Sequence, residues 1–431
     1  MFFIYDEPMT HTVLRGTKDI LPEESALWQH VEAQARHIFS LYDYKEIRTP
    51  IFELESLFNR VIGDESDIVQ KEMYTFTDKG GRELALRPEG TAAVARAYLA
   101  NHMSRQSGES KLYYLGPMFR YERPQSGRYR QFHQIGLENI GSAHPHTDAE
   151  IISLCYQLFT SLNLSNVRIH INSVGSEACR ESIRKHVIDY FSAHTKQFSE
   201  QQKQTFEKNP LRLLDSKDKH IQALIADGFE LKSALSEDAR QHFQSVTAYL
   251  DTLGVPYTYS PNLVRGLDYY TDTVFEIISD DLGSQNSICG GGRYNHLIRD
   301  IGGPDTPAFG FAFGLERLIL LLESQKQAAN NSKARVYMAA LGEPCKKASI
   351  SIMQQLRNAG ICVFTDHSKS DLNPHLKRAN KSKATMALIL GDSELNDGTI
   401  IVKNMASNSQ DRVSIEALIP YFDSQGLTCS K

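Results

Sequence analysis

The sequence predicts an α+β protein built on antiparallel strands and followed by a C-terminal α/β domain. Three observations indicate this fold class. Residues 111–141 alternate apolar and other residues in two runs, separated by a loop with Pro and Gly, which is typical of a long β-hairpin. Residues 172–262 are polar and helix-forming, which predicts a helical insertion. From residue 335 onward, strand and helix patterns alternate.

Bulk composition narrows the class of protein. The chain has 431 residues, enough for two or three domains, and 41% hydrophobic and 23% charged residues are ordinary for a globular protein. The net charge of −5 argues against nonspecific binding of nucleic acid by the whole molecule. Six cysteines without a CxxC pair favour a reducing cytosol, and we expect a cytoplasmic protein. Neither a signal peptide nor an apolar run of the ~20 residues that a membrane helix needs is recognisable.

The N-terminal part begins with a predicted amphipathic helix. Apolar residues recur at three- and four-residue spacing over residues 27–42, and Pro22 marks the start of this helix. A short strand over 44–50 ends at Pro50, which belongs at an edge or interface because proline lacks a ladder donor. Residues 73–76 and 83–87 form a predicted second hairpin around Gly80 and Gly81.

An alanine-rich helix over residues 92–101 follows Glu89 and Thr91. Local rules make Thr91 a helix N-cap and Glu89 a favourable acid near the first turn. The alternative is that the two side chains bind an ammonium group. Both interpretations remain open from these residues alone.

The long hairpin at 111–141 carries two kinds of polar residue. Between Arg120 and Arg130 there are four arginines and one glutamate, and such an excess is either solvated or paired with an anion. On the second strand, Gln134 and Glu138 are four residues apart and therefore share a face. The combination predicts a pocket for a zwitterionic group beside a phosphorylated one.

Two segments after the hairpin carry weaker signals. His144 and His146 have the spacing of metal ligands, but no further ligands lie near them in the sequence and Asp148 is a good helix cap, so we predict no metal site there. Regular β patterning returns over 262–270 and again over 273–278. Three glycines at 290–292 allow the backbone to approach a ligand or another strand closely.

Residues 309–314 alternate Phe with Gly or Ala, so one face of the predicted strand is aromatic and the other is nearly bare backbone. Arg317 then lies in the first turn of a helix, where the macrodipole disfavours a cation unless an anion offsets it. Glu316 is one candidate anion. The other is a nucleotide phosphate at the helix start, for which the bare strand face leaves room.

Residues 325–334 are polar and lack an apolar stripe, which predicts a linker. The ~95 residues after it predict an α/β domain with a mainly parallel sheet. This domain has twelve basic and nine acidic residues, whereas the rest of the chain is acidic. Its basic residues gather in one helix region, which is either a solvated face or an RNA contact: Lys377, Arg378, Lys381 and Lys383.

Taken together, these stretches resemble the histidyl-tRNA synthetases, a family of class II aminoacyl-tRNA synthetases. The helix leading to Pro50, the segment 119–122 with its loop, and the segment 314–317 resemble the three motifs of the class. The segments 263–270 and 289–294 resemble the two histidine-specific motifs. Asn295 and His296 depart from the Asp-Gly that is common in the family.

The resemblance implies an α+β class II synthetase core, an antiparallel sheet flanked by helices, with a helical insertion and a C-terminal α/β anticodon-binding domain. The implied domains are a catalytic domain at 1–171 and 263–324, an insertion at 172–262, the linker at 325–334 and an anticodon-binding domain at 335–431. The insertion is expected to contact the tRNA acceptor arm, and family members are homodimers through the first motif.

The resemblance also implies residue roles. The histidine-binding residues would be Glu89, Thr91, Gln134, Glu138, Tyr269 and Tyr270. The ATP-binding residues would be Arg120, Glu122, Arg128, Phe132 and Arg317. Arg265 and Arg120 would be the catalytic arginines, on the α-phosphate as the histidine carboxylate attacks. Mg²⁺ would accompany ATP, and Arg123 and Gln125 on the hairpin loop would contact tRNA(His).

The implied activity is the ATP-dependent attachment of L-histidine to tRNA(His) through histidyl-adenylate. The alternative is a non-catalytic, histidine-sensing regulatory subunit of ATP phosphoribosyltransferase, which typically lacks the C-terminal domain and much of the motif chemistry. A class II enzyme for proline or threonine is a third interpretation, but it leaves the 263–270 segment unexplained.

Overall fold

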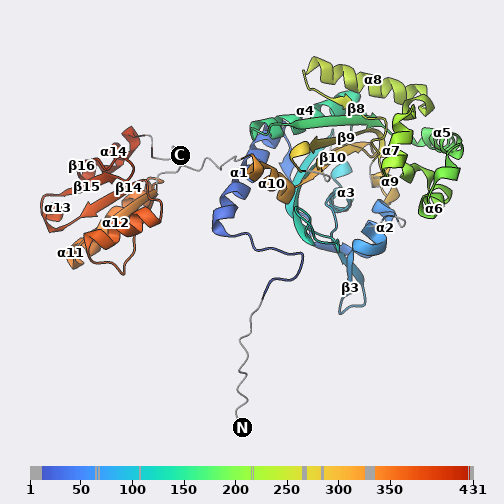
Figure 1. Cartoon of the computed structure of the whole chain (residues 1–431). Helices are drawn as coiled ribbons and strands as arrows, with labels where there is room; N and C mark the ends of the chain where they lie inside the picture. Colours follow the sequence, from blue (N-terminus) through green and yellow to red (C-terminus); the bar gives the residue numbers. More distant parts are fainter. Residues whose placement is uncertain are drawn as a thin grey trace, which may run out of the picture. The chain divides into compact units, whose positions relative to one another are not determined.

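The computed structural model describes residues 12–63, 66, 68–105, 108–214 (backbone only at 212), 216, 218–264, 269–282, 286–325, 335–425 and 427. The chain forms two compact units, Met1–Ala329 and Asn330–Lys431 (Figure 1). Most of the predicted linker, residues 326–334, lies outside the described residues. Within the described part, no helix combines the length and apolarity that a membrane span requires.

The first unit is organised around one large sheet with the strand order β1-β5-β6-β11-β10-β9-β7-β8. The two outermost pairs, β1 with β5 and β7 with β8, are parallel, and the pairings among the other strands are antiparallel. The antiparallel sheet predicted for the core is therefore confirmed. Its strands are β1 Lys45–Glu46, β5 Ser110–Phe119, β6 Gln131–Ile140, β7 Val167–Ser173, β8 Thr258–Tyr259, β9 Thr271–Ser279, β10 Ser287–Arg293 and β11 Ala308–Gly314.

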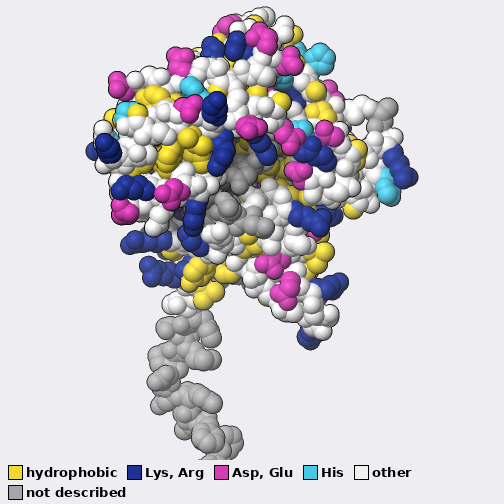
Figure 2. Space-filling view, turned by 90° about the vertical axis from the view of Figure 1, so that its right-hand side faces the viewer, with side chains coloured by type: hydrophobic (Ala, Val, Ile, Leu, Met, Phe, Trp, Pro, Cys, Tyr) yellow, Lys and Arg dark blue, Asp and Glu magenta, His cyan; other side chains and the backbone are white. Residues whose placement is uncertain are grey.

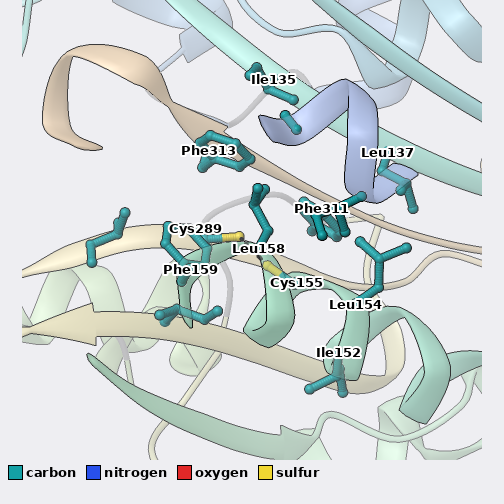
Figure 3. Close-up of a cluster of buried hydrophobic side chains, with 14 of the residues drawn as sticks. Ile135, Leu137, Ile152, Leu154, Cys155, Leu158, Phe159, Cys289, Phe311 and Phe313 are labelled. Carbon is teal, nitrogen blue, oxygen red and sulfur yellow. Dashed lines mark hydrogen bonds between the residues drawn. The ribbon is translucent and has the colours of Figure 1, made fainter. Parts of the chain in front are cut away.

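One face of this sheet is apolar and covered by long helices. These are α1 Pro22–Leu41, α4 Pro145–Ser161, α8 Glu237–Thr252 and α10 Leu315–Ser324. The aromatic side chains Phe309, Phe311 and Phe313 of β11 are buried in this cluster, as their alternation predicts. Figure 3 shows β11 and β6 side chains packed against Leu154 and Leu158 of α4. Burial of this face is the main source of hydrophobic stabilisation of the unit.

The opposite face of the sheet carries smaller elements. A second, three-stranded sheet has the order β2-β4-β3, with β2 Phe52–Leu54, β3 Tyr74–Thr77 and β4 Glu83–Leu86. Its β3–β4 hairpin is the one predicted around Gly80 and Gly81, and Gly81 has φ +77°, which suits glycine. Helices α2 Glu55–Ile62, α3 Thr91–Ala100 and α9 Leu297–Asp300 contribute to a second buried cluster beside it.

The insertion is helical, as predicted. It contains α5 Arg180–Ser192, α6 Glu200–Lys208 and α7 Lys219–Ala226, with short 3₁₀ turns between them. The side chain of Ser199 caps α6 in a capping box with Gln202, and the Asp218 carboxylate caps α7. The last helix of the predicted range, α8, lies beside α4, which packs on the large sheet (Figure 1). The predicted domain boundaries themselves remain predictions.

The second unit has a five-stranded sheet with the order β13-β12-β14-β15-β16. Its elements are β12 Arg335–Ala340, α11 Glu343–Asn358, β13 Cys362–Phe364, α12 Leu372–Lys381, β14 Met386–Leu390, α13 Asp392–Asn396, β15 Thr399–Asn404, β16 Gln410–Ser414 and α14 Leu418–Ser424. The prediction of a mainly parallel sheet is wrong for half of its pairings, because β14–β15 and β15–β16 are antiparallel. The short connection at 405–409 allows only a hairpin, since a parallel crossover needs a dozen or more residues.

The region 262–270, for which β patterning predicted a strand, shows no strand in its described residues. Residues 263–264 and 269–270 have no strand structure, and residues 265–268 lie outside the described residues. The following strand, β9, begins at Thr271 and was predicted over 273–278. Of the described residues here, Val264 packs against the hydrophobic cluster of the insertion, whereas Tyr269 and Tyr270 join the second buried cluster of the first unit.

Candidate active site

The candidate site lies on the polar face of strand β6. Phe132, Gln134 and Glu138 are at alternate positions and so share that face, while Ile135 and Leu137 between them join the apolar cluster on the other side. Across the ladder, Gln134 is paired with Gly116 and Gly314, and Glu138 is paired with Leu112 and Gly310. The face that the sequence predicts for a pocket is thus bordered by glycine backbone on its β11 side.

Glu138 is the centre of a buried hydrogen-bond cluster. Its Oε1 accepts a hydrogen bond from Thr91 Oγ1 at 2.8 Å, and its Oε2 accepts one from the Tyr294 hydroxyl. The side chain is 2% exposed. Burial raises the pKa of Glu138 to about 8, although the hydrogen bonds from Tyr294 and Thr91 oppose the rise. A cation that enters the site would stabilise the charged form of this carboxyl group.

Glu89 lies next to this cluster at the start of helix α3. Its carboxylate accepts hydrogen bonds from the backbone N–H groups of Thr91 at 2.6 Å and Ala92 at 2.9 Å. Burial raises the pKa of Glu89, while these two backbone bonds and the charge of Arg120 lower it. Thr91 is not the N-cap that local rules predicted, because Glu89 satisfies the helix donors and the Thr91 hydroxyl is directed to Glu138.

Four tyrosines surround these carboxyl groups. The rings of Tyr269 and Tyr270 are 4.7 Å apart, and those of Tyr269 and Tyr294 are 5.6 Å apart. Burial raises the pKa of Tyr114, Tyr269 and Tyr294 well above the usual value for a phenol. The charge of Glu138 raises the pKa of all three further, and that of Glu89 raises the pKa of Tyr114 and Tyr269. The hydroxyls therefore remain protonated and can donate hydrogen bonds.

Two of these tyrosines were missed by the sequence reasoning. Tyr294 is separated from the glycine run by Arg293, and nothing in the local pattern shows that its hydroxyl reaches Glu138. Tyr114 is paired across the hairpin with Gly136, and a Cβ at residue 136 would overlap the Tyr114 ring. That pairing of a large residue with glycine is the signal that could have identified Tyr114.

Gly310 is required for the position of Glu138. A Cβ at residue 310 would overlap Glu138 Oε2 and would also approach the backbone oxygen of Leu137 too closely. The bare face of β11 was predicted to leave room for a nucleotide. At Gly310 the room is filled by the Glu138 carboxyl group instead.

This cluster also contains buried polar atoms that lack a hydrogen-bond partner. Among the described residues, Gln134 Oε1 and the Tyr114 hydroxyl are buried without a hydrogen-bond partner. Buried polar atoms are normally satisfied, so their orphan state is typical of a ligand site. Two carboxyl groups, an amide oxygen and phenol hydroxyls together suit a small cation with hydrogen-bond donors.

Arginines form the other end of the same strand face. The guanidinium of Arg120 lies 5.3 Å from the centroid of the Phe132 ring, and its Nε donates to the Pro88 backbone oxygen at 2.8 Å. The Glu122 carboxylate lies 3.8 Å from Arg120 Nη1 and 3.4 Å from Arg128 Nη1. One carboxylate thus holds two arginine side chains in place and leaves a net positive region suited to phosphate.

Arg317 lies in the first turn of α10. Burial lowers the pKa of Arg317, as does the charge of Arg128, whereas Glu276 and Glu122 raise it. Glu316, which local rules offered as the offsetting anion, has a different partner: its carboxylate accepts from the His133 backbone N–H at 2.9 and 3.0 Å and lies 2.9 Å from His133 Nδ1. Glu316 is therefore engaged by His133, and the acids that act on the charge of the half-buried Arg317 are Glu276 and Glu122.

Comparison with known proteins decides the family. The model described as Histidyl-tRNA synthetase matches residues 16–318, and the one described as Anticodon binding domain matches residues 335–425. This chain belongs to the histidyl-tRNA synthetase family. The first match covers the large sheet, the carboxyl–tyrosine pocket and the arginine end, and the second covers the five-stranded sheet.

Individual members of the family are similar over nearly the whole chain. A histidine–tRNA ligase of Synechococcus sp. (strain JA-3-3Ab) is 45% identical over 412 residues, which cover 96% of this chain and 98% of the relative. One of Thermosynechococcus vestitus is 47% identical and covers 94% of each chain. The crystal structure of apo S. aureus histidyl-tRNA synthetase has a TM-score of 0.80 at 36% identity and covers 96% of this chain and 99% of that one.

These similarities bear on the predicted alternatives. Both the catalytic and the anticodon-binding regions of histidyl-tRNA synthetases are present, so the regulatory-subunit alternative has less support. A class II enzyme for another amino acid has no support from the relatives.

Arg265, the predicted catalytic arginine, lies outside the described residues. Arg123 and Gln125 are exposed on the loop of the β5–β6 hairpin, and the Gln125 backbone exchanges hydrogen bonds with that of Arg128. No cluster of three metal-binding side chains occurs among the residues that the structure describes. Asp148, predicted as a helix cap, instead pairs with Arg293 and His242.

Proposed function

We propose that this chain attaches L-histidine to tRNA(His) in two steps, with histidyl-adenylate as the intermediate and ATP as the energy source. The observation that supports this most directly is the arrangement along β6. An acidic, tyrosine-lined pocket around Glu138 adjoins an arginine region around Arg120 on the same strand face. A zwitterion and a triphosphate bound there would meet at their reacting ends.

The acidic pocket would hold the amino acid. Glu89, Thr91, Gln134 and Glu138 supply acceptors for the ammonium group, and the orphan Gln134 Oε1 is one of them. Tyr269 and Tyr270, together with Tyr294, supply hydroxyls for the imidazole. A site that hydrogen-bonds the imidazole disfavours side chains that leave its polar groups unpaired, by ~10⁴-fold in comparable sites.

The arginine region would hold ATP. Arg120 would contact the α-phosphate and Arg317 the γ-phosphate, while Phe132 would stack on adenine and Glu122 and Arg128 would hold the nucleotide. Mg²⁺ would arrive with the phosphates. Glu122 and Glu276, the acids that act on the Arg317 charge, fit the one or two carboxylates that such a Mg²⁺ usually takes.

The chemistry requires positioning and charge stabilisation. The histidine carboxylate attacks the α-phosphorus, the bond to the β-phosphate oxygen breaks, and pyrophosphate leaves. Arg120 and, by resemblance, Arg265 would stabilise the added charge on the pentacovalent phosphorus, so no protein nucleophile is needed. A terminal ribose hydroxyl of tRNA then attacks the acyl carbon, and AMP leaves.

Partners and setting complete the proposal. Arg123 and Gln125 would contact the tRNA end from the hairpin loop. A homodimer would form through the first motif, the helix and segment that lead to Pro50. The edge strand β2, which follows Pro50, exposes Phe52 and Leu54 by 53% and 52%. The protein would act in the cytoplasm, in keeping with its described cysteines, none of which is in a disulfide.

Charging of a tRNA(His) transcript with labelled histidine tests the proposal. We expect acid-precipitable histidine that depends on ATP and Mg²⁺ and on that tRNA. A chain that binds histidine and transfers none to tRNA would contradict the ligase and favour the regulatory alternative.

A further inference from the structure

The insertion joins the catalytic sheet at a narrow base. Strand β7 ends at Ser173, and the next two residues continue its pairing with the catalytic domain: Val174 N donates to Asp272 O at 2.8 Å, and Asp272 N donates to Gly175 O at 2.9 Å. Asp272 has φ +48°, a left-handed conformation that costs energy outside glycine. The chain thus keeps a strained residue at the point where the insertion begins.

Beyond this base, the insertion has a hydrophobic core of its own. Ile183, Val187 and Phe191 of α5 pack with Ile221 of α7 and with Phe229, separate from the clusters on the two faces of the large sheet. Among the described helices, α8 joins both regions, because Ala239 in its first turn belongs to the insertion core and its later turns belong to the catalytic core. The orientation of α5–α7 therefore depends on a few contacts at the base.

A charged cluster supplies such contacts. His296 Nε2 lies 3.4 Å from Glu177 Oε2, and His296 Nδ1 lies 2.9 Å from Asp305 Oδ1. Arg299 Nη1 lies 3.3 Å from the same Glu177 oxygen. Glu177 begins the first turn of the insertion, Glu177–Cys179, whereas the other three belong to the catalytic domain. The hydrogen bond and charge of Arg299, and then the charge of His296, lower the pKa of Glu177.

The same short segment of the catalytic domain also serves the histidine pocket. Tyr294, two residues before His296, donates to Glu138. Asn295, between them, accepts from Arg293 at 3.1 Å and donates to Asp272 at 3.3 Å. His296 therefore connects the hydrogen-bonded segment 293–295 to Glu177 of the insertion. Figure 2 shows the side of the molecule that carries α5 and α6, where basic, acidic and histidine side chains intermingle.

We propose that His296 and Arg299 form a latch on Glu177 that sets the orientation of the insertion on the catalytic domain, and that they are positioning residues for the tRNA acceptor end. The inference rests on the proposed function and goes beyond it, because neither residue touches histidine or ATP. The latch acts in the step that uses tRNA. Formation of the adenylate does not depend on it.

The expected size of the effect follows from exposure. The side chains of Glu177 and Arg299 are 48% and 42% exposed, and pairs this exposed are weak individually. Two such contacts on one carboxylate favour one orientation of the insertion over others by a population ratio of about three to ten. They are too weak to determine whether the domain folds. A global loss of stability is therefore not expected.

Substitutions at the latch are a better probe than removal of the insertion, since a deletion of 172–262 would also take α8 out of the catalytic core. The double variant His296→Gly with Arg299→Gln removes the catalytic side of the latch, and Glu177→Gln removes the insertion side. Arg168→Gln is the matched control, because Arg168 forms an exposed 2.5 Å pair with Asp280 that does not join the insertion to the catalytic domain.

Three readouts decide the outcome in full-length protein. We expect the tRNA KM for aminoacylation to rise about threefold to tenfold in either latch variant, with histidine-dependent pyrophosphate exchange within about twofold of the unsubstituted protein. Amide hydrogen exchange over residues 177–183 should accelerate in both, and combining the variants should add little, since they break the same contacts. The control should change none of these.

The outcomes that overturn the latch are distinct from those that overturn the ligase. An unchanged tRNA KM with unchanged amide exchange, or a loss of pyrophosphate exchange equal to the tRNA effect, would contradict the latch. Absence of any histidine-dependent exchange in the unsubstituted protein would contradict the proposed function. In that case the amide-exchange comparison would still test the contact itself.

Discussion

The two faces of strand β6 differ in what they contact and in what they contribute. Ile135 and Leu137 are fully buried among the helices on one face. Gln134 and Glu138, at alternate positions, lie on the other face. There Gln134 Oε1 has no hydrogen-bond partner, and burial raises the pKa of Glu138. Neighbouring residues of the strand therefore have different roles: one side chain stabilises the fold, and the next lies in the candidate site. Substitutions on the two faces should affect different measurements.

The largest effect is expected on the apolar face. Phe311 of β11 is 2% exposed and packs against the rings of Phe39 and Phe275. Phe311→Ala should destabilise the unit by about 3–5 kcal/mol, because it leaves a cavity in a close-packed core. The fluorescence of Trp28, the single tryptophan of the chain and part of the same cluster, reports unfolding in denaturant.

Leu253→Ala is the control for that prediction, since Leu253 is 53% exposed and should change stability by no more than about 0.5 kcal/mol. A loss below about 1 kcal/mol for Phe311→Ala would mean that the aromatic face is not the main source of stability.

On the polar face, Arg120→Ala should slow adenylate formation about 10²–10³-fold, because a preorganised donor to the developing phosphate charge is lost. Pyrophosphate exchange measures the rate. Arg123→Ala, on the same hairpin loop but exposed, should leave exchange intact, and equal losses in the two variants would contradict the assigned difference.

Gly310→Ala tests the position of Glu138 on the polar face. The added methyl group would overlap the Glu138 carboxyl group and displace it from Thr91 and Tyr294. The KM for histidine should rise about tenfold or more, with a smaller change for ATP, since tenfold corresponds to the loss of a single hydrogen bond of about 1.4 kcal/mol. Ala312→Gly, two residues along the same strand, should have a much smaller effect, and a Gly310→Ala enzyme with unchanged KM would rule out this positioning.

The smallest effect concerns pH. The pKa of Glu138, about 8, lies above that of an unfolded-state glutamate. Protonation of Glu138 therefore adds to the free energy of unfolding of the ligand-free protein at low pH. This added stability is lost as the pH rises through about 8. A bound ammonium group favours the carboxylate, so histidine affinity should rise between pH 7 and 8 by at most tenfold. Calorimetric titration checks this rise, and a slope that survives in Glu138→Gln would assign it to another group.

Much of this arrangement was predictable from periodicity. The period of two placed Gln134 and Glu138 on one face, and the arginine excess indicated an anion next to them. The strand and turn patterns also predicted both hairpins of the catalytic unit, because the residues that specify a hairpin are close in sequence.

What could not be predicted depends on strand order. The Tyr294–Glu138 hydrogen bond joins residues far apart in the chain. It is possible because a single strand, β11, lies between β6 and β10 in the sheet. Asp148 and Glu316 look like local helix acids in sequence, yet their partners, Arg293 and His133, come from distant strands. Local rules assign such residues to caps and dipoles because they contain no term for tertiary partners.

Pyrophosphate–ATP exchange with single amino acids tests the central claim most directly, that one strand face binds histidine beside ATP and activates it. We predict exchange that requires L-histidine and Mg²⁺ and proceeds without tRNA, and that is lost with proline or threonine in place of histidine. Exchange that is equal with proline, or that is absent with histidine in folded protein, would contradict it.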